Sequence, residues 1–504
     1  MNTPRQPAAP SHSEWQAMAE RLQPDPRPVL GGVRCATAAG ASFDVVNPYT
    51  GRVLAAIPCC GAELAGQALR LARQTADSGD WPRRAPSERA QVLRKLADRI
   101  EAHGDELALL DSLQMGMPVA MARDDITLAA RKLREVAATA ERQHDALLPS
   151  VAGTWVANQR VPQGVVLAIT PWNFPLFVAL AKIGPALAMG NAVVLKPSEI
   201  APLACLRLGD LAAEAGLPAG ALSVLPGLGA ELGGLLAQDP RIDMIAFTGS
   251  TATGRALMRA SAASNLKALQ LELGGKSPQV VLDDCGNIDA LAQSLADGFA
   301  YNTGQVCVAG SRLLVARDLA DALLPRVAQA TRNWVIGDPL DPATTLGPLA
   351  TRVQFDRVRG FLDDARAAGW REYANPTPCS GLQLAPTLFA GVPVEAALAQ
   401  DEVFGPVAAA SFIADDEDAI RLANASRYGL VATVWCSEMA RGLTVAGRIS
   451  AGGVTLNTHT APLATRSIGA SIEPVRESGF GVEGGVAGLL AYTRLRQLTV
   501  QFRA

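Results

Sequence analysis

The sequence predicts an α/β fold with two doubly wound parallel sheets. Between residues 165 and 247, short apolar runs of strand length alternate with longer stretches of helical periodicity, a pattern typical of parallel sheets that carry helices on both faces. Polar and glycine-rich motifs directly follow several of these runs, and ligands of open α/β sheets bind at such strand ends. Because 504 residues exceed one ordinary core, two or three domains are expected.

The N-terminal region is expected to become ordered only gradually. Residues 1–30 are rich in proline and polar side chains, so we expect a mobile arm there. Residues 44–51 read as a strand that ends in a turn marked by proline and glycine. From Ser87, the predicted N-cap, apolar residues recur at helical spacing as far as His103, which predicts an amphipathic helix.

The remaining elements follow in order along the chain. Further helices are predicted at 105–113 and 121–143, followed by an irregular, strand-like stretch at 147–162. The strands of the first parallel sheet are expected at 165–169, 192–195, 223–225 and 244–247, with a helix at 201–214. A second α/β half is predicted after Gly274, with strands at 280–282 and 311–315, and it runs to about residue 470.

Charge and composition argue against several classes of function. The formal net charge of −3 offers no basic surface for nucleic acid. The first 28 residues lack the apolar core of a secretory signal, and no run approaches about 18 apolar residues, so we expect neither export nor a membrane span. The eight cysteines and four histidines show no metal-ligand spacing. We therefore predict reduced thiols, a cytoplasmic location and no metal site.

One cysteine has the surroundings of a nucleophile. Cys307 lies among small, apolar and glycine residues that leave its thiol accessible to a substrate. A thiolate nucleophile needs a positively polarised environment and a partner base, and the upstream candidates are Glu272 as the base and Asn173 as an amide donor. Each residue alone has an ordinary explanation, because a single cysteine is more often a small buried hydrophobe and a glutamate a solvated surface group.

Six motifs in register make the constellation far more specific than its single members. With them the chain resembles the aldehyde dehydrogenase superfamily from about Asp44 to the C-terminus. The motifs are Pro171-Trp172-Asn173-Phe174, Lys196-Pro197-Ser198-Glu199, Phe247-Thr248-Gly249-Ser250, Glu272-Leu273-Gly274-Gly275-Lys276, Gly304-Gln305-Val306-Cys307 and Glu402-Val403-Phe404-Gly405-Pro406.

The resemblance implies a hydrolytic, non-acylating enzyme. Cys307 would attack the aldehyde to form a thiohemiacetal, while the Asn173 amide and the Cys307 backbone N–H hold the oxyanion. After hydride loss, Glu272 would activate the water that hydrolyses the thioester. Relatives that transfer the acyl group to coenzyme A generally lack a base at this position. Lys182 and Glu483 match residues proposed to relay the proton away from the base, with a structural ion pair as the alternative.

The resemblance also assigns the cofactor residues. Ser250 would contact the pyrophosphate, Gly229 and Gly233 would lie near the adenine, and Lys196 with Glu199 would hold the adenine ribose. Glu402 would bind the nicotinamide ribose and Phe404 would lie near the nicotinamide. NAD is favoured over NADP because the Glu199 carboxylate would repel a 2′-phosphate, although Lys196 keeps NADP as an alternative. The other matching cofactor residues are Ile169, Thr170, Pro171, Trp172, Ser198, Phe247, Gly249, Leu273 and Gly274.

Small and apolar residues are expected to line the substrate tunnel. By the same matching they are Phe174, Phe177, Val178, Ala181, Val306, Val308 and His459. Small aliphatic side chains would leave room for a medium-sized apolar aldehyde, aliphatic or aromatic. The chain departs from the family at Ser471–Gly479, where a common Gly-Gly pair is lost, so the loop beside the tunnel is expected to take a different path.

The sequence therefore predicts an NAD-dependent aldehyde dehydrogenase that forms a homodimer or homotetramer. The expected domains are a mobile arm at 1–30, an NAD-binding domain at 31–143 and 163–273, a catalytic domain at 274–470, and oligomerisation strands at 144–162 and 486–504. Two alternatives remain open: a semialdehyde dehydrogenase, which would carry an arginine in the tunnel, and a non-catalytic NAD-binding scaffold.

Overall fold

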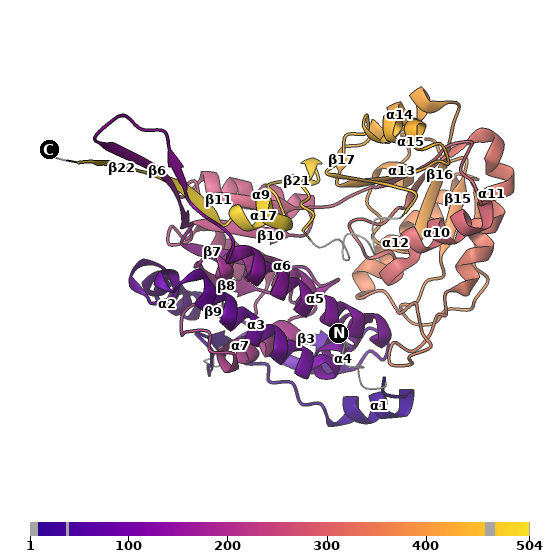
Figure 1. Cartoon of the computed structure of the whole chain (residues 1–504). Helices are drawn as coiled ribbons and strands as arrows, with labels where there is room; N and C mark the ends of the chain where they lie inside the picture. The colour runs from indigo at the N-terminus through magenta and orange to yellow at the C-terminus, as the bar shows by residue number, and fades with distance from the viewer. Residues whose placement is uncertain (1–8, 37–39, 459–468, 503–504) are drawn as a thin grey trace.

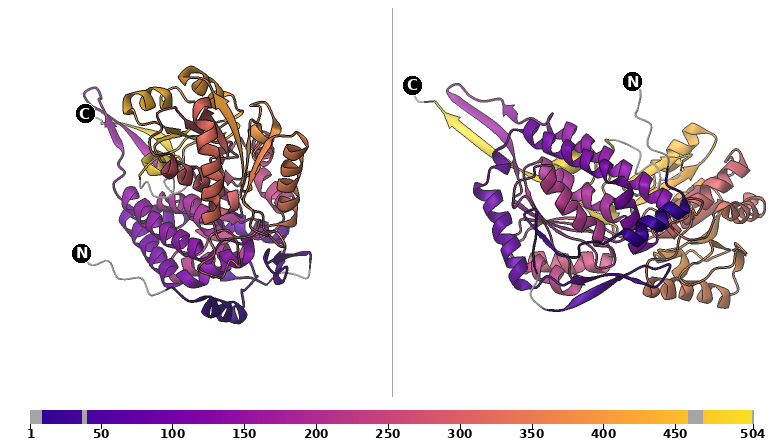
Figure 2. Two further views of the ribbon diagram at one scale, coloured as in Figure 1. Left: turned by 90° about the vertical axis from the view of Figure 1, so that its right-hand side faces the viewer. Right: turned by 90° about the horizontal axis from the view of Figure 1, so that it is seen from below.

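The fold consists of two α/β halves and a long antiparallel arm (Figure 1). A computed structural model describes residues 9–36, 40–458 and 469–502. One half is built from the N-terminal part of the chain, indigo to magenta in Figure 1, and the other from the orange part. The arm projects from the first half, with the C-terminus at its far end (Figure 2).

The first half is organised around an eight-stranded sheet. The strand order is β2-β1-β9-β8-β7-β10-β11-β21, and the five central strands from β9 to β11 run parallel. Every residue of β7 and β8 is buried, as expected for parallel strands covered on both faces. The bounds are β1 Val29–Leu30, β2 Val33–Arg34, β7 Val165–Ile169, β8 Ala192–Lys196, β9 Leu222–Val224, β10 Met244–Thr248, β11 Ala268–Glu272 and β21 Gly479–Phe480. The four strands predicted from the sequence are confirmed, each within one residue at either end.

Helices cover both faces of this sheet. Their bounds are α2 Ala62–Ser78, α3 Pro86–Ala102, α4 Gly104–Met115, α5 Val119–Ala140, α6 Pro175–Ala188, α7 Leu203–Glu214, α8 Gly234–Gln238 and α9 Thr251–Ala262, with short helices η1 Trp81–Arg83 and η2 Gly229–Gly233. The predicted N-cap Ser87 is wrong, because α3 begins at Pro86 with Ala85 as its N-cap. The Glu88 carboxylate accepts the Ala85 backbone N–H at 2.8 Å, and proline suits the first helical position because it lacks an N–H.

The N-terminal segment is not a mobile arm throughout. Residues His12–Arg21 form helix α1, whose Ser11 N-cap and Glu14 side chain make a reciprocal capping box. Trp15 is fully buried against Leu109 and Leu113. One large buried aromatic therefore docks a segment that is otherwise polar, and ordered structure begins well before Asp44.

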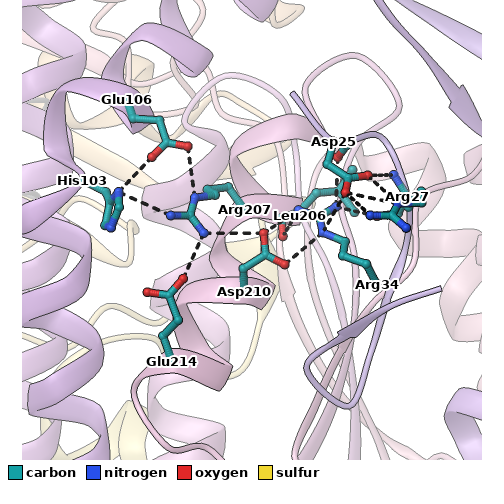
Figure 3. Close-up of polar contacts among 9 residues, drawn as sticks. All are labelled: Asp25, Arg27, Arg34, His103, Glu106, Leu206, Arg207, Asp210 and Glu214. Atoms are coloured by element: carbon teal, nitrogen blue, oxygen red, sulfur yellow. Dashed lines mark hydrogen bonds and ion pairs between the residues drawn. The ribbon is translucent and has the colours of Figure 1, made fainter. Parts of the chain in front are cut away.

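A network of charged side chains connects the segment that contains β2 to helices α4 and α7 of the first half (Figure 3). Arg34, on β2, donates to the Asp210 carboxylate on α7 at 2.7 and 2.9 Å. On the same helix, Arg207 reaches Glu106 of α4 at 3.0 Å and Glu214 at 3.3 Å (Figure 3). Each of these two arginines is paired with carboxylates, so the network holds β2 against α7 and α7 against α4.

The second half contains a seven-stranded sheet in the order β14-β15-β16-β13-β12-β18-β19. Only the edge pair β14 and β15 is antiparallel. The bounds are β12 Pro278–Val281, β13 Arg312–Ala316, β14 Arg371–Ala374, β15 Thr387–Ala390, β16 Val407–Ile413, β18 Val431–Trp435 and β19 Gly453–Leu456. Its helices are α10 Ile288–Ala300, α11 Arg317–Ala330, α12 Arg352–Ala367, α13 Ala397–Gln400, α14 Asp416–Asn424 and α15 Met439–Ala446, with η3 Tyr301–Gly304 and η4 Thr331–Asn333.

The arm is a separate three-stranded sheet in the order β22-β6-β5. Its strands are β5 Ala146–Leu148, β6 Thr154–Pro162 and β22 Thr493–Gln501, and α17 Gly485–Leu490 leads into it. β22 and β6 pair antiparallel along nine residues each. Two further pairs, β3 Ser42–Val46 with β4 Val53–Pro58 and β17 Tyr428–Gly429 with β20 Val475–Arg476, complete the strands. Among the described residues, no helix is long and apolar enough to cross a membrane.

Candidate active site

The predicted cofactor motifs meet at one edge of the first sheet. Ile169 at the end of β7 pairs in register with Lys196 of β8 and with Phe247 of β10. Thr248 at the end of β10 pairs with Glu272 of β11. Because these strands are parallel, the segments that follow them emerge side by side at the carboxyl edge, where ligands of such sheets bind.

Cys307 follows a tight turn that only particular residues can form. Asn302, Thr303 and Gly304 all have positive φ, at 49°, 57° and 69°. A side chain at Gly304 would overlap with the carbonyl oxygen of Gly405, so glycine lets the turn pass against the segment that follows Glu402. Asn302 and Thr303 donate hydrogen bonds to the Asn173 and Gly347 carbonyls at 3.0 and 3.1 Å.

The thiol of Cys307 lies in an acidic setting. The residue is partly exposed, yet burial of the sulfur, followed by the Glu402, Glu272 and Glu483 carboxylates, raises its pKa to about 12. Its own backbone N–H faces the sulfur and lowers the pKa slightly. The described side chains around Cys307 thus favour the neutral thiol, whereas the sequence led us to expect a positively polarised environment.

Glu272 is a buried carboxyl next to an ion pair. Burial, and to a lesser degree the Glu483 charge, raise its pKa well above the ordinary value, while Lys182 opposes the shift. Its Oε1 atom is buried without a hydrogen-bond partner among the described residues. The fully buried Lys182 donates from Nζ to Glu483 Oε2 at 2.8 Å. A carboxyl with a raised pKa is well suited to accept a proton near neutral pH.

Asn173 is fixed beside the cysteine turn. The residue is buried, and its Nδ2 donates to the carbonyl oxygen of Gln305 at 2.8 Å. A side-chain amide has two N–H groups, so one is used in holding the turn. The amide thereby contacts Gln305, which lies two residues before Cys307 in the chain.

The residues predicted for the adenine end of the cofactor gather in one place. Lys196 Nζ contacts Glu199 Oε2 at 3.2 Å, and Glu199 Oε1 accepts the backbone N–H of Gly229 at 3.4 Å. A side chain at Gly233 would touch the aliphatic part of Lys196. The Ser198 hydroxyl accepts the Ile200 N–H at 3.3 Å in the same turn.

The residues predicted for the pyrophosphate surround the start of α9. Ser250 is the exposed N-cap of that helix, and its Oγ accepts the Thr253 N–H at 3.2 Å. The Phe247 ring lies directly against Gly249, where any larger residue would overlap with it. A helix N-terminus with exposed N–H groups attracts anions.

The residues predicted for the nicotinamide end lie between the two halves. Glu402 Oε1 accepts the backbone N–H of Gly275 at 3.0 Å, and a Cβ at Gly274 would lie 2.6 Å from Glu402 Oε2. Burial raises the pKa of Glu402 to about 7. The Trp172 and Phe404 rings meet edge to face at 5.4 Å. Among the other predicted cofactor residues, Thr170 is buried directly after β7 and next to Pro171, and the Leu273 N–H donates to the Ser478 carbonyl at 2.9 Å.

The predicted tunnel residues share one face of α6. Within this helix, Phe177, Val178 and Ala181 alone are partly exposed, and their spacing puts them on one side. Phe174 stacks on Tyr301 with ring centroids 6.4 Å apart. Val306 is buried and Val308 partly exposed on either side of Cys307. His459 lies outside the described residues.

Two neighbours of these residues were not predicted. Tyr301 covers Phe174, and Lys132 of α5 holds its Nζ 5.5 Å from the centre of the Phe177 ring. Neither belongs to a recognisable motif, and Lys132 comes from a helix 45 residues earlier in the chain. Within the described part of the chain, no group of three or more potential ligands could hold a metal ion.

Comparison with known proteins gives a consistent picture. A model of the aldehyde dehydrogenase family matches residues 36–498. The NADP/NAD-dependent aldehyde dehydrogenase PuuC of Escherichia coli is 39% identical, with 97% of this chain and 98% of that protein covered. The aminoacetaldehyde dehydrogenase of Pseudomonas aeruginosa is 38% identical, with 94% of each chain covered. Among solved structures, the P. syringae indole-3-acetaldehyde dehydrogenase AldA in complex with NAD+ and IAA has a TM-score of 0.95 at 37% identity, covering 98% of this chain and 100% of that one.

Proposed function

The chain belongs to the aldehyde dehydrogenase family, and we propose that it oxidises a medium-sized apolar aldehyde, aliphatic or aromatic, to the carboxylic acid with NAD. NADP is the alternative cofactor, and the name of the E. coli relative includes both. One arrangement carries the proposal: the Glu272 charge acts on the partly exposed Cys307 thiol, and the Lys182–Glu483 ion pair acts on Glu272 in turn.

The residues at the carboxyl edge fit a dinucleotide. The N-terminus of α9 with Ser250 suits the pyrophosphate. Glu199, held between Lys196 and Gly229, suits the hydroxyls of the adenine ribose. Glu402 offers a second carboxylate for the other ribose, and Gly274 leaves room beside it. The bound nicotinamide would supply the hydride acceptor.

The first chemical step forms a bond between Cys307 Sγ and the aldehyde carbon. Because burial and the neighbouring carboxylates raise the pKa of this thiol to about 12, its proton has to leave as the sulfur attacks, and we assign Glu272, whose charge acts on the thiol, as the base that takes it. The oxyanion that develops would be held by the Cys307 backbone N–H and the second N–H of Asn173; removal of one such donor typically costs about 10²–10³ in rate. The product of this step is a thiohemiacetal.

Loss of hydride from the thiohemiacetal carbon leaves a thioester on Cys307. The proton that Glu272 took from the thiol has to leave before Glu272 can act again. We assign its removal to the Glu483 carboxylate, which can accept a proton and which Lys182 holds by a hydrogen bond of 2.8 Å; both charges act on Glu272. Glu272 then takes a proton from the water molecule that attacks the thioester carbon and passes this proton to the departing sulfur, so that the carboxylic acid and the free thiol are released.

The substrate preference rests on the exposed face of α6. Phe177, Val178 and Ala181 present apolar surface beside Phe174 and Val308, which suits an apolar chain or ring. Lys132 favours a second candidate: its ammonium near the Phe177 ring would pair with the carboxylate of a semialdehyde.

A panel of aldehydes tests both candidates. NADH formation would be followed by absorbance with apolar aliphatic, aromatic and carboxylated aldehydes, for the wild type beside Cys307→Ala. We expect the apolar aldehydes to react and the variant to lose activity by about 10³-fold or more. Turnover of carboxylated aldehydes alone, lost in Lys132→Met, would establish the second candidate. If NAD binds and no aldehyde reacts, the chain is a non-catalytic scaffold.

We further propose a homo-oligomer in the cytoplasm, a dimer or a tetramer. The arm exposes Leu147, Trp155, Leu495 and Leu498, and edge strands with such side chains invite pairing with a second copy. The location follows from the thiols, because all eight cysteines are free and a reducing compartment keeps them so.

A further inference from the structure

Residues 475–479, here called the bridging segment, join the two halves of the molecule across the cofactor site. They belong to the stretch where the sequence departs from its family. On one side, β20 pairs with β17, and the Glu477 N–H donates to the Arg427 carbonyl at 3.0 Å. On the other side, Gly479 of β21 pairs with Glu272 of β11.

Ser478 anchors the centre of the bridging segment. The residue is fully buried, and its Oγ donates to the Gly274 carbonyl at 2.7 Å while accepting the Gly429 N–H at 3.0 Å. Its carbonyl accepts the Leu273 N–H at 2.9 Å. These hydrogen bonds therefore fix the backbone next to Glu477 between the two halves.

Glu477 contacts the helix that is proposed to bind the pyrophosphate. Its Oε1 lies 2.9 Å from Arg255, in the second turn of α9, and its carbonyl accepts the Thr251 hydroxyl at 3.1 Å. Thr251 is the first residue of the helix that Ser250 caps. The contact thus fixes the helix N-terminus proposed to hold the pyrophosphate.

The same carboxylate reaches the nicotinamide side. Glu477 Oε2 lies 3.6 Å from Arg427 Nε, and Arg427 in turn donates to Asp401 at 2.8 Å. Asp401 directly precedes Glu402, whose carbonyl is held by Arg357 at 2.6 Å. A continuous chain of charges therefore runs from α9 through Glu477 to the loop that carries Glu402.

We propose that Glu477 is a positioning residue for the cofactor. By pairing with Arg255 and Arg427 together, it sets the spacing between the pyrophosphate-binding and the ribose-binding groups before NAD arrives. This inference rests on the proposed function, in which Ser250 contacts the pyrophosphate and Glu402 the nicotinamide ribose of one NAD molecule. Glu477 itself contacts neither the substrate nor the reacting atoms, so its loss weakens binding and leaves the chemical step intact.

Two variants with opposite charge changes separate positioning from simple charge effects. Glu477→Gln removes a negative charge beside the pyrophosphate site, which by itself would strengthen the binding of an anionic cofactor. Arg255→Gln removes a positive charge and would by itself weaken it. Both variants break the same ion pair. If the pair positions α9, both weaken NAD binding, and the double variant is no worse than either single one.

The experiment measures NAD dissociation constants by calorimetry without aldehyde, and kcat and KM for NAD with it. We expect Glu477→Gln and Arg255→Gln each to raise both the dissociation constant and the KM about two- to five-fold, the range open to partly exposed ion pairs, with kcat unchanged. Glu372→Gln is the matched control, because Glu372 pairs with Arg366 at 2.7 Å with similar exposure on β14; it should change nothing.

The outcomes are distinct. Opposite effects of the two single variants, adding in the double variant, would show a through-space charge effect and overturn the inference. So would an unchanged NAD affinity in Glu477→Gln. A wild-type protein that binds no NAD would instead overturn the proposed function on which the inference rests.

Discussion

At the residue scale, the surroundings of Cys307 raise the pKa of its thiol. Burial is the largest cause, the carboxylates of Glu402, Glu272 and Glu483 follow, and no cation is among the causes. A free thiolate is therefore disfavoured before the substrate arrives, and attack on the carbonyl has to be coupled to proton removal. Glu272, with its own pKa raised by burial, is matched to this task, since a carboxylate of ordinary pKa would be a poor base for a thiol.

Asp125, a buried carboxyl on which the Asp111 charge acts, makes the stability of the folded protein depend on pH. Asp125 is buried on α5, and its Oδ2 has no partner among the described residues. Burial, then the charges of Asp111 and Asp124, raise its pKa well above the ordinary value. The folded protein thus keeps a proton that the unfolded chain loses near about pH 4, so stability falls as the pH rises above that value.

Asp125→Asn should therefore stabilise the protein, more at pH 8 than at pH 5. The amide keeps the shape of the side chain and removes the cost of a buried charge, and we expect Tm to rise by about 2–4 °C at pH 8. Thermal unfolding at the two pH values measures this, with the exposed neighbour Asp124→Asn as the control. A gain of equal size at both pH values, or a loss, would contradict the assignment.

The sequence pointed to residues that lie in a motif and missed those that do not. Cys307, Glu272 and Glu402 lie in motifs of the resembling family, and the motifs that contain Lys196 and Ser250 also follow predicted strands. Lys132 and Tyr301 were missed because their roles come from contacts across the fold, with Phe177 and Phe174. The acidity around Cys307 was missed for the same reason, because Glu402 and Glu483 lie far from it in the chain and approach it only after folding.

At the element scale, the turn Tyr301–Gly304 leads into the loop that carries Cys307 and packs against the loop that carries Glu402. Gly304 has a φ of 69° and lies so close to Gly405 that a Cβ would overlap with the carbonyl oxygen there. The turn therefore has little freedom. The position of the turn matters for catalysis, because a small displacement of a nucleophile costs much of the rate.

Gly304→Ala should abolish most of the activity. A matched control exists in Gly369→Ala, because Gly369 has a similar φ of 74° with nothing within 4 Å of the added methyl group. The control carries only the conformational cost of a positive φ, about 1–2 kcal/mol, and should keep its kcat. Steady-state kinetics with melting curves measure the two effects. Equal losses of kcat in both variants would refute the claim of a close approach at Gly304.

The strands of the sheets were easier to predict than the short elements. β7 is apolar throughout and β8 is apolar up to Lys196, so their burial is visible in the sequence. Helix α1 was missed because a single buried residue, Trp15, docks it, and a polar, proline-rich segment otherwise reads as mobile. β20 and β21 have two residues each, which is too short for any periodicity to show.

At the scale of the whole molecule, the arm is the surface that we propose contacts a second copy of the chain. β22 and β6 extend away from the first half (Figure 2) and expose Leu495, Leu498 and Trp155. Because β5 pairs with only three residues of β6, much of the arm is a two-stranded ribbon, which has marginal stability on its own in water. Contact with a second copy would bury these side chains and the free edge of the sheet.

Leu495→Lys should weaken the proposed oligomer without unfolding the chain. Leu495 is 56% exposed, so a lysine there costs the subunit little, whereas it would place a charge inside a subunit interface. Light scattering during gel filtration should show a shift toward a smaller species. The control is Val353→Lys on α12, which is 79% exposed and lies outside the arm. A wild-type protein that is already monomeric would contradict the proposal.

The most direct test of the mechanism is a single-turnover experiment with Glu272→Gln. In this account Glu272 is the base both for the attack of Cys307 and for the hydrolysis of the thioester, so we predict that NADH forms without a burst and that turnover falls about 10²–10⁴-fold. Mass spectrometry of the wild type, quenched during turnover, should find the acyl group on the peptide that contains Cys307. Full steady turnover in Glu272→Gln, or an acyl group on any other residue, would contradict the roles assigned to Glu272 and Cys307.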